Sequence, residues 1–93
     1  MDTEIGGLIE KAAAALKAAG AREVYVFGSV SKGKLRPDSD VDIAVSGLPP
    51  EGFFRAMGKA SRAVGRPVDL IDLDEDNPFA RYLKSKGELL RVG

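Results

Sequence analysis

The sequence has no cysteine and no histidine, and each absence removes a class of chemistry. Without cysteine the chain cannot form a disulfide bond. Without histidine it lacks the usual general base of serine and cysteine hydrolases and the commonest zinc ligand in proteins. Carboxylates, hydroxyls, Lys and Arg remain, and this set suits phosphate groups and hard cations such as Mg²⁺ and Mn²⁺.

Net charge and long hydrophobic runs are also missing. Fourteen basic and fourteen acidic residues cancel, so no overall field draws the protein toward nucleic acid or an anionic membrane. We therefore expect no direct nucleic-acid partner, because such a role would need a local basic patch. The longest apolar runs, such as residues 12–16, are too short to span a membrane, and no signal-like segment lies near the N-terminus. These features predict a soluble cytoplasmic protein without a membrane partner.

The length of 93 residues is typical of one domain, and we expect a single domain over residues 1–93. Helical patterns of apolar residues cover 3–19, from 50 to about 64, and from 78 to about 86, and each is followed by glycine. The residues expected on the buried side of the first helix are Ile5, Leu8, Ile9, Ala12 and Leu16. The residues expected on the buried side of the second are Phe53, Phe54, Met57, Ala60 and Val64.

Short runs of β-branched and aromatic residues predict strands at 23–27, 41–45 and 67–73, and 88–92 could add an edge strand. The polar segment 29–38 is expected to be a loop or a short helical turn. Helices and strands alternate along the chain, which predicts an α/β fold of two layers. We expect a small mixed sheet of three to four strands, with helices packed mainly on one face.

Asp40 and Asp42 stand two residues apart at the start of a predicted strand. Their side chains should therefore leave the same face of the sheet, roughly 6 to 7 Å apart along the strand. Two like charges on one face repel each other, and a cation between or beside them would explain the arrangement. For an isolated Asp-x-Asp pair the simpler alternative is a turn at Asp40 and a solvent-facing Asp42.

Two further features are weak when each is taken alone. Gly28 and Ser29 follow a buried strand, where glycine lets the backbone approach a ligand and the hydroxyl can donate to phosphate. A simple turn is the alternative at this position. Asp69 lies in the third predicted strand between apolar neighbours, so its carboxylate needs either a partner or solvent.

Together these residues form a recognisable pattern. The chain resembles the minimal nucleotidyltransferases of the DNA polymerase β-like superfamily, whose signature is Gly-Ser, ten residues, Asp-x-Asp and a later third Asp. Here Gly28 and Ser29 are followed by ten residues and then by Asp40 and Asp42, and Asp69 takes the third place. The resemblance covers nearly the whole chain and implies the nucleotidyltransferase fold.

The resemblance implies transfer of a nucleoside monophosphate, AMP from ATP or its counterpart from another nucleoside triphosphate, to an acceptor hydroxyl. Asp40 and Asp42 would bind Mg²⁺, with Mn²⁺ as an alternative, and one of two ions would arrive with the nucleotide. Asp69 would complete the metal site and help to activate the acceptor, as general base or through the metal.

The phosphates would be held by Gly28 and Ser29, with Lys32 as a charge partner. Relatives often have Arg after Gly-Ser and again before the loop glycine, whereas this chain has Val30 and Lys32 at these positions. Lys keeps the positive charge but lacks the bidentate fork of Arg.

Stand-alone domains of this size in the family commonly act as antitoxins that adenylylate a tyrosine of a helical HEPN-type RNase toxin, and the resemblance implies such a partner here. Two alternatives stay open. The domain could neutralise its partner by contact alone, or it could modify a small molecule such as an aminoglycoside. The sequence leaves the choice between a monomer and a homo-oligomer open as well.

Overall fold

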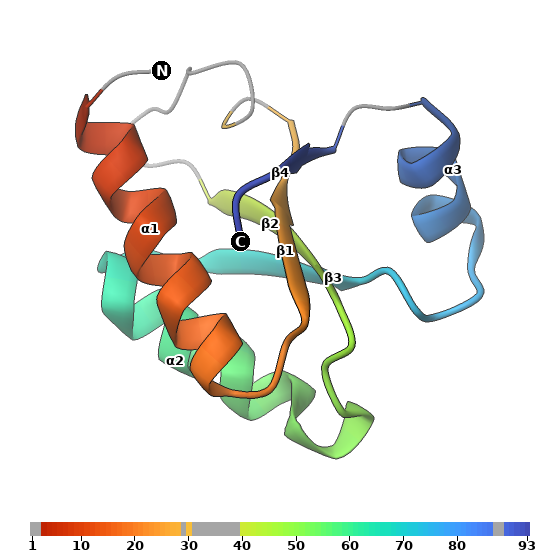
Figure 1. Cartoon of the computed structure of the whole chain (residues 1–93), viewed down its shortest axis with the longest axis horizontal. Coiled ribbons are helices and arrows are strands. Elements are labelled where there is room, and N and C mark those ends of the chain that lie inside the picture. The colour runs from red at the N-terminus through yellow and green to blue at the C-terminus, as the bar shows by residue number, and fades with distance from the viewer. Residues whose placement is uncertain (1–2, 29, 31–39, 87–88) are drawn as a thin grey trace.

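The computed structural model describes residues 3–28, 30, 40–86 and 89–93, with the side chains of residues 3–5 excepted (Figure 1). The helices are α1 (Thr3–Ala18), a 3₁₀ turn η2 (Pro50–Gly52), α2 (Phe53–Val64) and α3 (Pro78–Lys86). The strands are β1 (Glu23–Val26), β2 (Val41–Ser46), β3 (Val68–Asp72) and β4 (Leu90–Arg91). No helix in these ranges is both long and apolar enough to cross a membrane.

The four strands form one mixed sheet in the order β3-β2-β1-β4. Strand β1 is antiparallel to both β2 and β4, whereas β2 and β3 run parallel. Parallel neighbours need a crossover connection, and α2 supplies it between β2 and β3. The crossover brings the two aspartate-bearing strands side by side.

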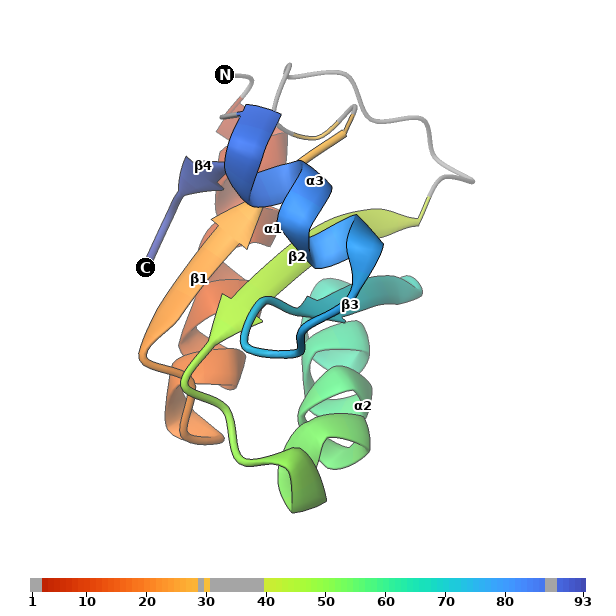
Figure 2. The same ribbon diagram turned by 90° about the vertical axis from the view of Figure 1, so that its right-hand side faces the viewer.

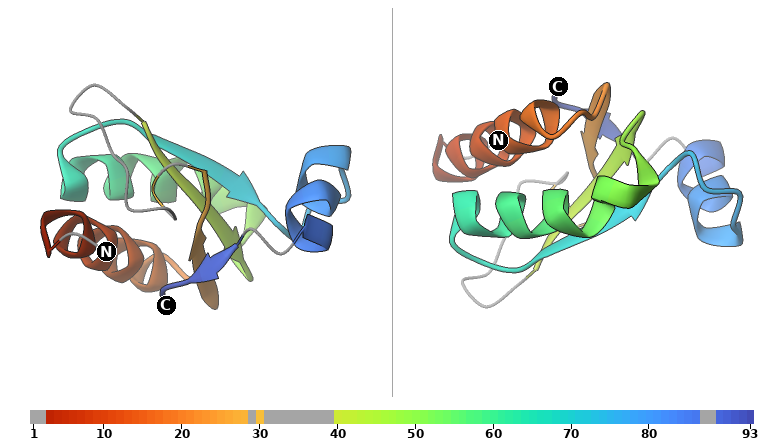
Figure 3. Two further views of the ribbon diagram at one scale, coloured as in Figure 1. Left: turned by 90° about the horizontal axis from the view of Figure 1, so that it is seen from above. Right: turned by 90° about the horizontal axis from the view of Figure 1, so that it is seen from below.

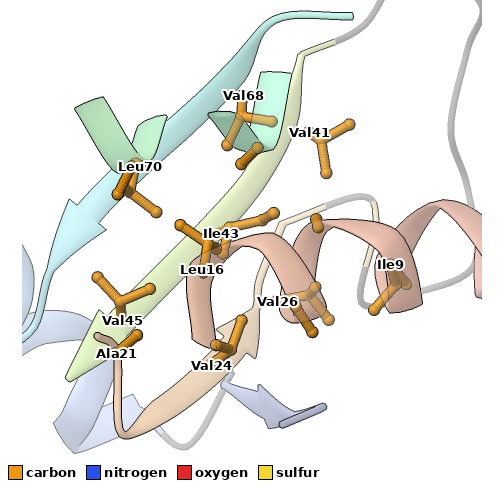
Figure 4. Packing of buried hydrophobic residues seen from close by; sticks show 14 of the residues in the cluster. Ile9, Leu16, Ala21, Val24, Val26, Val41, Ile43, Val45, Val68 and Leu70 are labelled. Atoms are coloured by element: carbon orange, nitrogen blue, oxygen red, sulfur yellow. The ribbon is translucent and has the colours of Figure 1, made fainter. Parts of the chain in front are cut away.

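Helices α1 and α2 pack next to each other on one face of the sheet (Figure 3). Apolar side chains from both helices and from β1, β2 and β3 interdigitate between the layers and form the main core (Figure 4). Its largest fully buried members include Leu16, Ile43, Val24, Val26, Val41 and Val45. This layer of helix on sheet holds β2 and β3 in a fixed position.

Helix α3 lies on the other side of the sheet. In Figure 2 it crosses in front of the strands, while α1 and α2 lie behind them. A smaller buried cluster attaches it, made of Phe27, Ala44, Leu73 and Leu83. The α/β class, the mixed sheet and the packing of helices mainly on one face are therefore confirmed.

The glycine predicted to follow α1 ends that helix. Gly20 has a positive φ of 116°, a conformation that side chains disfavour. Its N–H bonds to the carbonyl of Lys17, and the N–H of Ala21 bonds to that of Leu16. This pair of bonds satisfies the last carbonyls of the helix and turns the chain toward β1.

One predicted core position is wrong. Phe54 was expected on the buried side of α2, but 80% of its surface is exposed. The helix turns its small residues Ala56 and Ala60, together with Val64, to the core, so Phe54 falls outside that side. The edge strand is also shorter than 88–92, because β4 comprises only Leu90–Arg91.

Candidate active site

Strands β2 and β3 alternate in the manner that the sequence predicts. Val41, Ile43 and Val45 point into the main core. Because successive side chains of a strand point to opposite faces, Asp42 lies on the other face, away from α1 and α2. On β3 the same alternation places Val68 in the core and leaves Asp69 exposed on the opposite face.

The register of the parallel pair brings two of the predicted carboxylates together. Asp42 lies opposite Asp69, and adjacent strands run about 4.8 Å apart. Asp40, exposed and two residues before Asp42, belongs to the same side by strand periodicity. Partial burial, and then the negative charges of Asp69 and Asp40, raise the pKa of Asp42 above its ordinary value. The charges of Asp69 and Asp40 therefore act on the Asp42 carboxylate.

Gly28 lies directly against the carboxylate of Asp42. A Cβ placed on Gly28 would come within 2.6 Å of Asp42 Oδ2, and the backbone φ of Gly28 is +67°. Both observations require glycine at this position. The chain approaches here because the N–H of Phe27 donates to the carbonyl of Asp42 at 3.2 Å. The two halves of the predicted motif thus meet in space.

The residues fit a hard divalent cation by their chemistry, since such ions prefer carboxylate oxygens. A cation would also offset the partial burial and the repulsion by Asp69 and Asp40 that together raise the pKa of Asp42. Within the described residues, the side chains as placed do not form a group of three acidic residues able to hold a metal ion. The site therefore places carboxylates on one face of the sheet, but these side chains do not surround a common metal position.

Two predicted nucleotide-binding residues, Ser29 and Lys32, lie outside the described residues. Between them, the side chain of Val30 is fully buried in the main core. The position where relatives often carry Arg therefore serves packing in this chain. The buried Val30 side chain is therefore not placed to contact a nucleotide.

The acidic run that follows β3 has a structural role. Asp74 accepts hydrogen bonds from the Ser46 hydroxyl and the Gly47 N–H, and these bonds lower its pKa below the ordinary value. Asp76 pairs with Arg81 at the start of α3. A surface pocket of about 340 Å³ borders this run but includes none of the three predicted catalytic carboxylates. Its lining residues are Leu48, Pro50, Asp72, Asp74 and Glu75.

The sequence did not single out Phe27 as part of the site. Besides bonding to the backbone of Asp42, its ring contacts Phe79 of α3 edge-on, with the centroids 5.9 Å apart. Phe27 therefore links the site to α3. The antiparallel register of β1 against β2 creates this proximity, and no local sequence pattern reveals it.

Comparison with known proteins assigns the family. The model of the family described as Polymerase beta, Nucleotidyltransferase matches residues 10–91. A search of curated proteins found no match. The chain belongs to the polymerase beta family of nucleotidyltransferases.

Solved structures agree with this assignment. A toxin-antitoxin solved with AMP-PNP is 25% identical, with a TM-score of 0.72 over 89% of this chain and 70% of that one. A structure described as a minimal nucleotidyltransferase is 25% identical, with a TM-score of 0.69 over 91% and 87%. A mutant of the toxin-antitoxin MntA-HpeT is also 25% identical, with a TM-score of 0.69 over 90% and 70%. The fold is that of the minimal nucleotidyltransferases.

Proposed function

We propose that this domain transfers a nucleoside monophosphate, AMP from ATP, to an acceptor hydroxyl. The observation that carries the proposal is the register of Asp42 against Asp69, with Asp40 on the same side and Gly28 packed against Asp42. Partial burial and the neighbouring charges of Asp69 and Asp40 raise the pKa of Asp42, and such a perturbed carboxylate is more typical of a functional site than of a purely structural one. Phosphoryl transfer uses such carboxylates, because it depends on positioning and charge stabilisation.

In the proposed reaction the acceptor oxygen forms a bond to the α-phosphorus of the nucleotide. The bond between the α-phosphorus and the bridging oxygen breaks, and pyrophosphate leaves. Asp69 takes the proton of the acceptor hydroxyl as general base. It suits this role because it is exposed on the edge strand β3, where an acceptor can reach it.

Asp40 and Asp42, with Asp69 beside them, would hold Mg²⁺, with Mn²⁺ as an alternative. Bound there, divalent ions would neutralise the phosphates and lower the pKa of the acceptor hydroxyl. Gly28, Ser29 and Lys32 would hold the terminal phosphates. The absence of a side chain at Gly28 supports this part of the proposal, because it lets the Gly28 backbone lie directly against the Asp42 carboxylate that would hold the metal.

For the acceptor we propose a tyrosine of a helical HEPN-type toxin, which makes the domain an antitoxin. Support comes from the structural similarity to toxin-antitoxin proteins, one of them solved with AMP-PNP.

Calorimetric titration of ATP tests the site itself. Wild type should bind ATP with Mg²⁺ and lose binding in EDTA, and Asp40→Asn/Asp42→Asn should lose it in both conditions. Glu10→Gln/Glu51→Gln is a matched control, because it removes two exposed acidic charges from α1 and η2. Equal loss in the control, or metal-independent binding by the Asn variant, would contradict the proposed site.

Co-expression with a helical HEPN-type toxin, sought among the reading frames next to this gene, tests the antitoxin role. With wild type, the mass of the partner should rise by the mass of AMP in the presence of ATP. Asp42→Asn should still form the complex but leave the partner unmodified and toxic. If Asp42→Asn neutralises the partner as well as wild type does, neutralisation occurs by contact alone.

A further inference from the structure

The outward side of α2 carries a line of basic residues that the proposed reaction does not use. Arg55, Lys59 and Arg62 follow each other at helical spacings of four and three residues. These spacings place them on one side of the helix, and we call the three residues the basic stripe.

The stripe differs from an ordinary solvated helix surface, where charges of both signs usually alternate. Helix α2 contains no acidic residue. Like charges three and four residues apart repel each other and weaken the helix. None of the three stripe residues forms an ion pair with the described part of the chain, where the pairs are Arg81–Asp76 and Arg91–Glu23. The nearest acidic residue in sequence is Glu51, in the preceding η2.

The stripe faces away from the candidate active site. Ala56, Ala60 and Val64 turn the opposite side of α2 toward the main core. Helix α2 lies with α1 on one face of the sheet (Figure 3). Strand alternation places Asp42 and Asp69 on the other face. Zero net charge over the whole chain therefore does not prevent a local concentration of basic residues on α2.

The chemistry of this surface fits a phosphate backbone. Two of the three residues are Arg, whose planar fork binds phosphate oxygens in pairs. The stripe itself contains no apolar side chain. Phe54 directly precedes Arg55 in sequence and lies about 100° round the helix from it. Its surface is 80% exposed, and its ring meets Phe53 edge-on at 5.5 Å. Exposed aromatic rings beside basic residues are the means by which proteins stack single-stranded bases.

We propose that the basic stripe of α2 and Phe54 form a binding surface for single-stranded nucleic acid. Arg55, Lys59 and Arg62 contact consecutive phosphates over about 10 Å of helix. Phe54 stacks on an unpaired base, which a duplex does not offer. Binding is independent of base sequence, because no side chain in the stripe is placed to distinguish bases.

Fluorescence anisotropy with a labelled oligouridylate measures the affinity for a single strand directly, over a series of salt concentrations. Each phosphate contact on a single strand contributes about 0.7 to the slope of log affinity against log salt. A fourfold increase in salt should therefore weaken a complex with three contacts about 20-fold. Arg55→Gln/Lys59→Gln/Arg62→Gln should lower the slope by about 2 and abolish most binding.

The matched control is Lys11→Gln/Lys84→Gln/Lys86→Gln, which removes the same charge from exposed positions on α1 and α3. The control should bind nearly as well as wild type. Equal loss in both variants, or no binding by wild type, overturns the proposal. Metal-dependent ATP binding should be unchanged in the stripe variant, so failure here is separable from failure of the proposed reaction.

Phe54→Ser tests the preference for single strands. Loss of one stacked base should weaken oligouridylate binding at least about fivefold. The slope of log affinity against log salt should remain that of wild type, because the phosphate contacts are intact. Equal affinity of wild type for a duplex of the same length, or no effect of Phe54→Ser, rules out the single-strand assignment. Circular dichroism of each variant confirms that α2 is still folded.

Discussion

Gly28 joins the two halves of the site, and it meets two separate demands. Its φ of +67° disfavours any side chain, and a Cβ would press on Asp42 Oδ2 at 2.6 Å. Gly65, at the end of α2, meets only the first demand. Its φ is +74°, and nothing lies within 4 Å of the position a Cβ would take. The pair therefore separates backbone strain from contact with the carboxylate.

Gly28→Ala should lower the free energy of unfolding by more than Gly65→Ala does. Backbone strain alone accounts for about 1 kcal/mol in both variants. Only Gly28→Ala should also abolish metal-dependent ATP binding, because it displaces the Asp42 carboxylate. Chemical denaturation and calorimetry measure the two effects. Normal ATP binding by Gly28→Ala would show that the contact with Asp42 is unimportant.

The negative charge on Asp42 should lower the stability of the folded protein at neutral pH. Its pKa is raised, so the ionised form is disfavoured in the folded state, and stability falls as pH rises above the ordinary Asp value. Asp42→Asn removes that charge, and it should raise the free energy of unfolding at neutral pH by about 0.5 kcal/mol. Near pH 3 the two proteins should be equally stable. A destabilised Asn variant at neutral pH would show that repulsion among the carboxylates is negligible.

At the scale of elements, Asp74 ties the end of β2 to the segment between β3 and α3. Its carboxylate accepts from Gly47 N at 2.6 Å and from Ser46 Oγ at 3.0 Å. Backbone and hydroxyl donors favour the ionised form, which is why its pKa is lowered. The hydrogen bonds of this turn therefore explain the carboxylate at position 74, and no metal ion is needed to explain it.

Asp74→Asn should lower the free energy of unfolding by about 1 kcal/mol at neutral pH. The contribution of a carboxylate with a lowered pKa is present above its ordinary pKa and is lost as pH falls through the folded value. The difference from wild type should therefore shrink below about pH 4. Asp76→Asn is the control, because the Asp76–Arg81 pair is exposed and should contribute little. Denaturation at several pH values tests both variants.

Local patterns were sufficient to predict most elements. Apolar spacing and the glycines at 20 and 65 located α1 and α2, and the aspartates of the motif indicated the face that carries the candidate site. Phe54 was misplaced because hydrophobicity suggested burial, whereas small alanines fill the space between α2 and the sheet. The pairing of Asp42 with Asp69 depends on strand register, which is a property of the assembled sheet.

At the scale of the whole molecule, the sheet separates two apolar clusters of unequal size. The main core joins α1 and α2 to three strands, whereas α3 packs on the smaller cluster of Phe27, Ala44, Leu73 and Leu83, to which partly buried apolar side chains are added. Local opening follows the number of buried apolar contacts, so α3 should open more readily than the rest. This matters for the candidate site, because α3 lies on the same side of the sheet as Asp42 and contacts Phe27 through Phe79.

Leu83→Ala should therefore release α3 while leaving the main core folded. Removing a buried leucine side chain costs about 2 to 5 kcal/mol. The small cluster has few other buried side chains, so it should no longer keep α3 attached after that loss. Hydrogen exchange should accelerate in residues 78–86 and stay slow in α1, β1 and β2. Leu16→Ala is the matched control, since Leu16 is fully buried in the main core and its loss should accelerate exchange throughout. If Leu83→Ala accelerates exchange in α1 as strongly as in α3, the two clusters unfold as one cooperative unit, and α3 cannot move independently of the site.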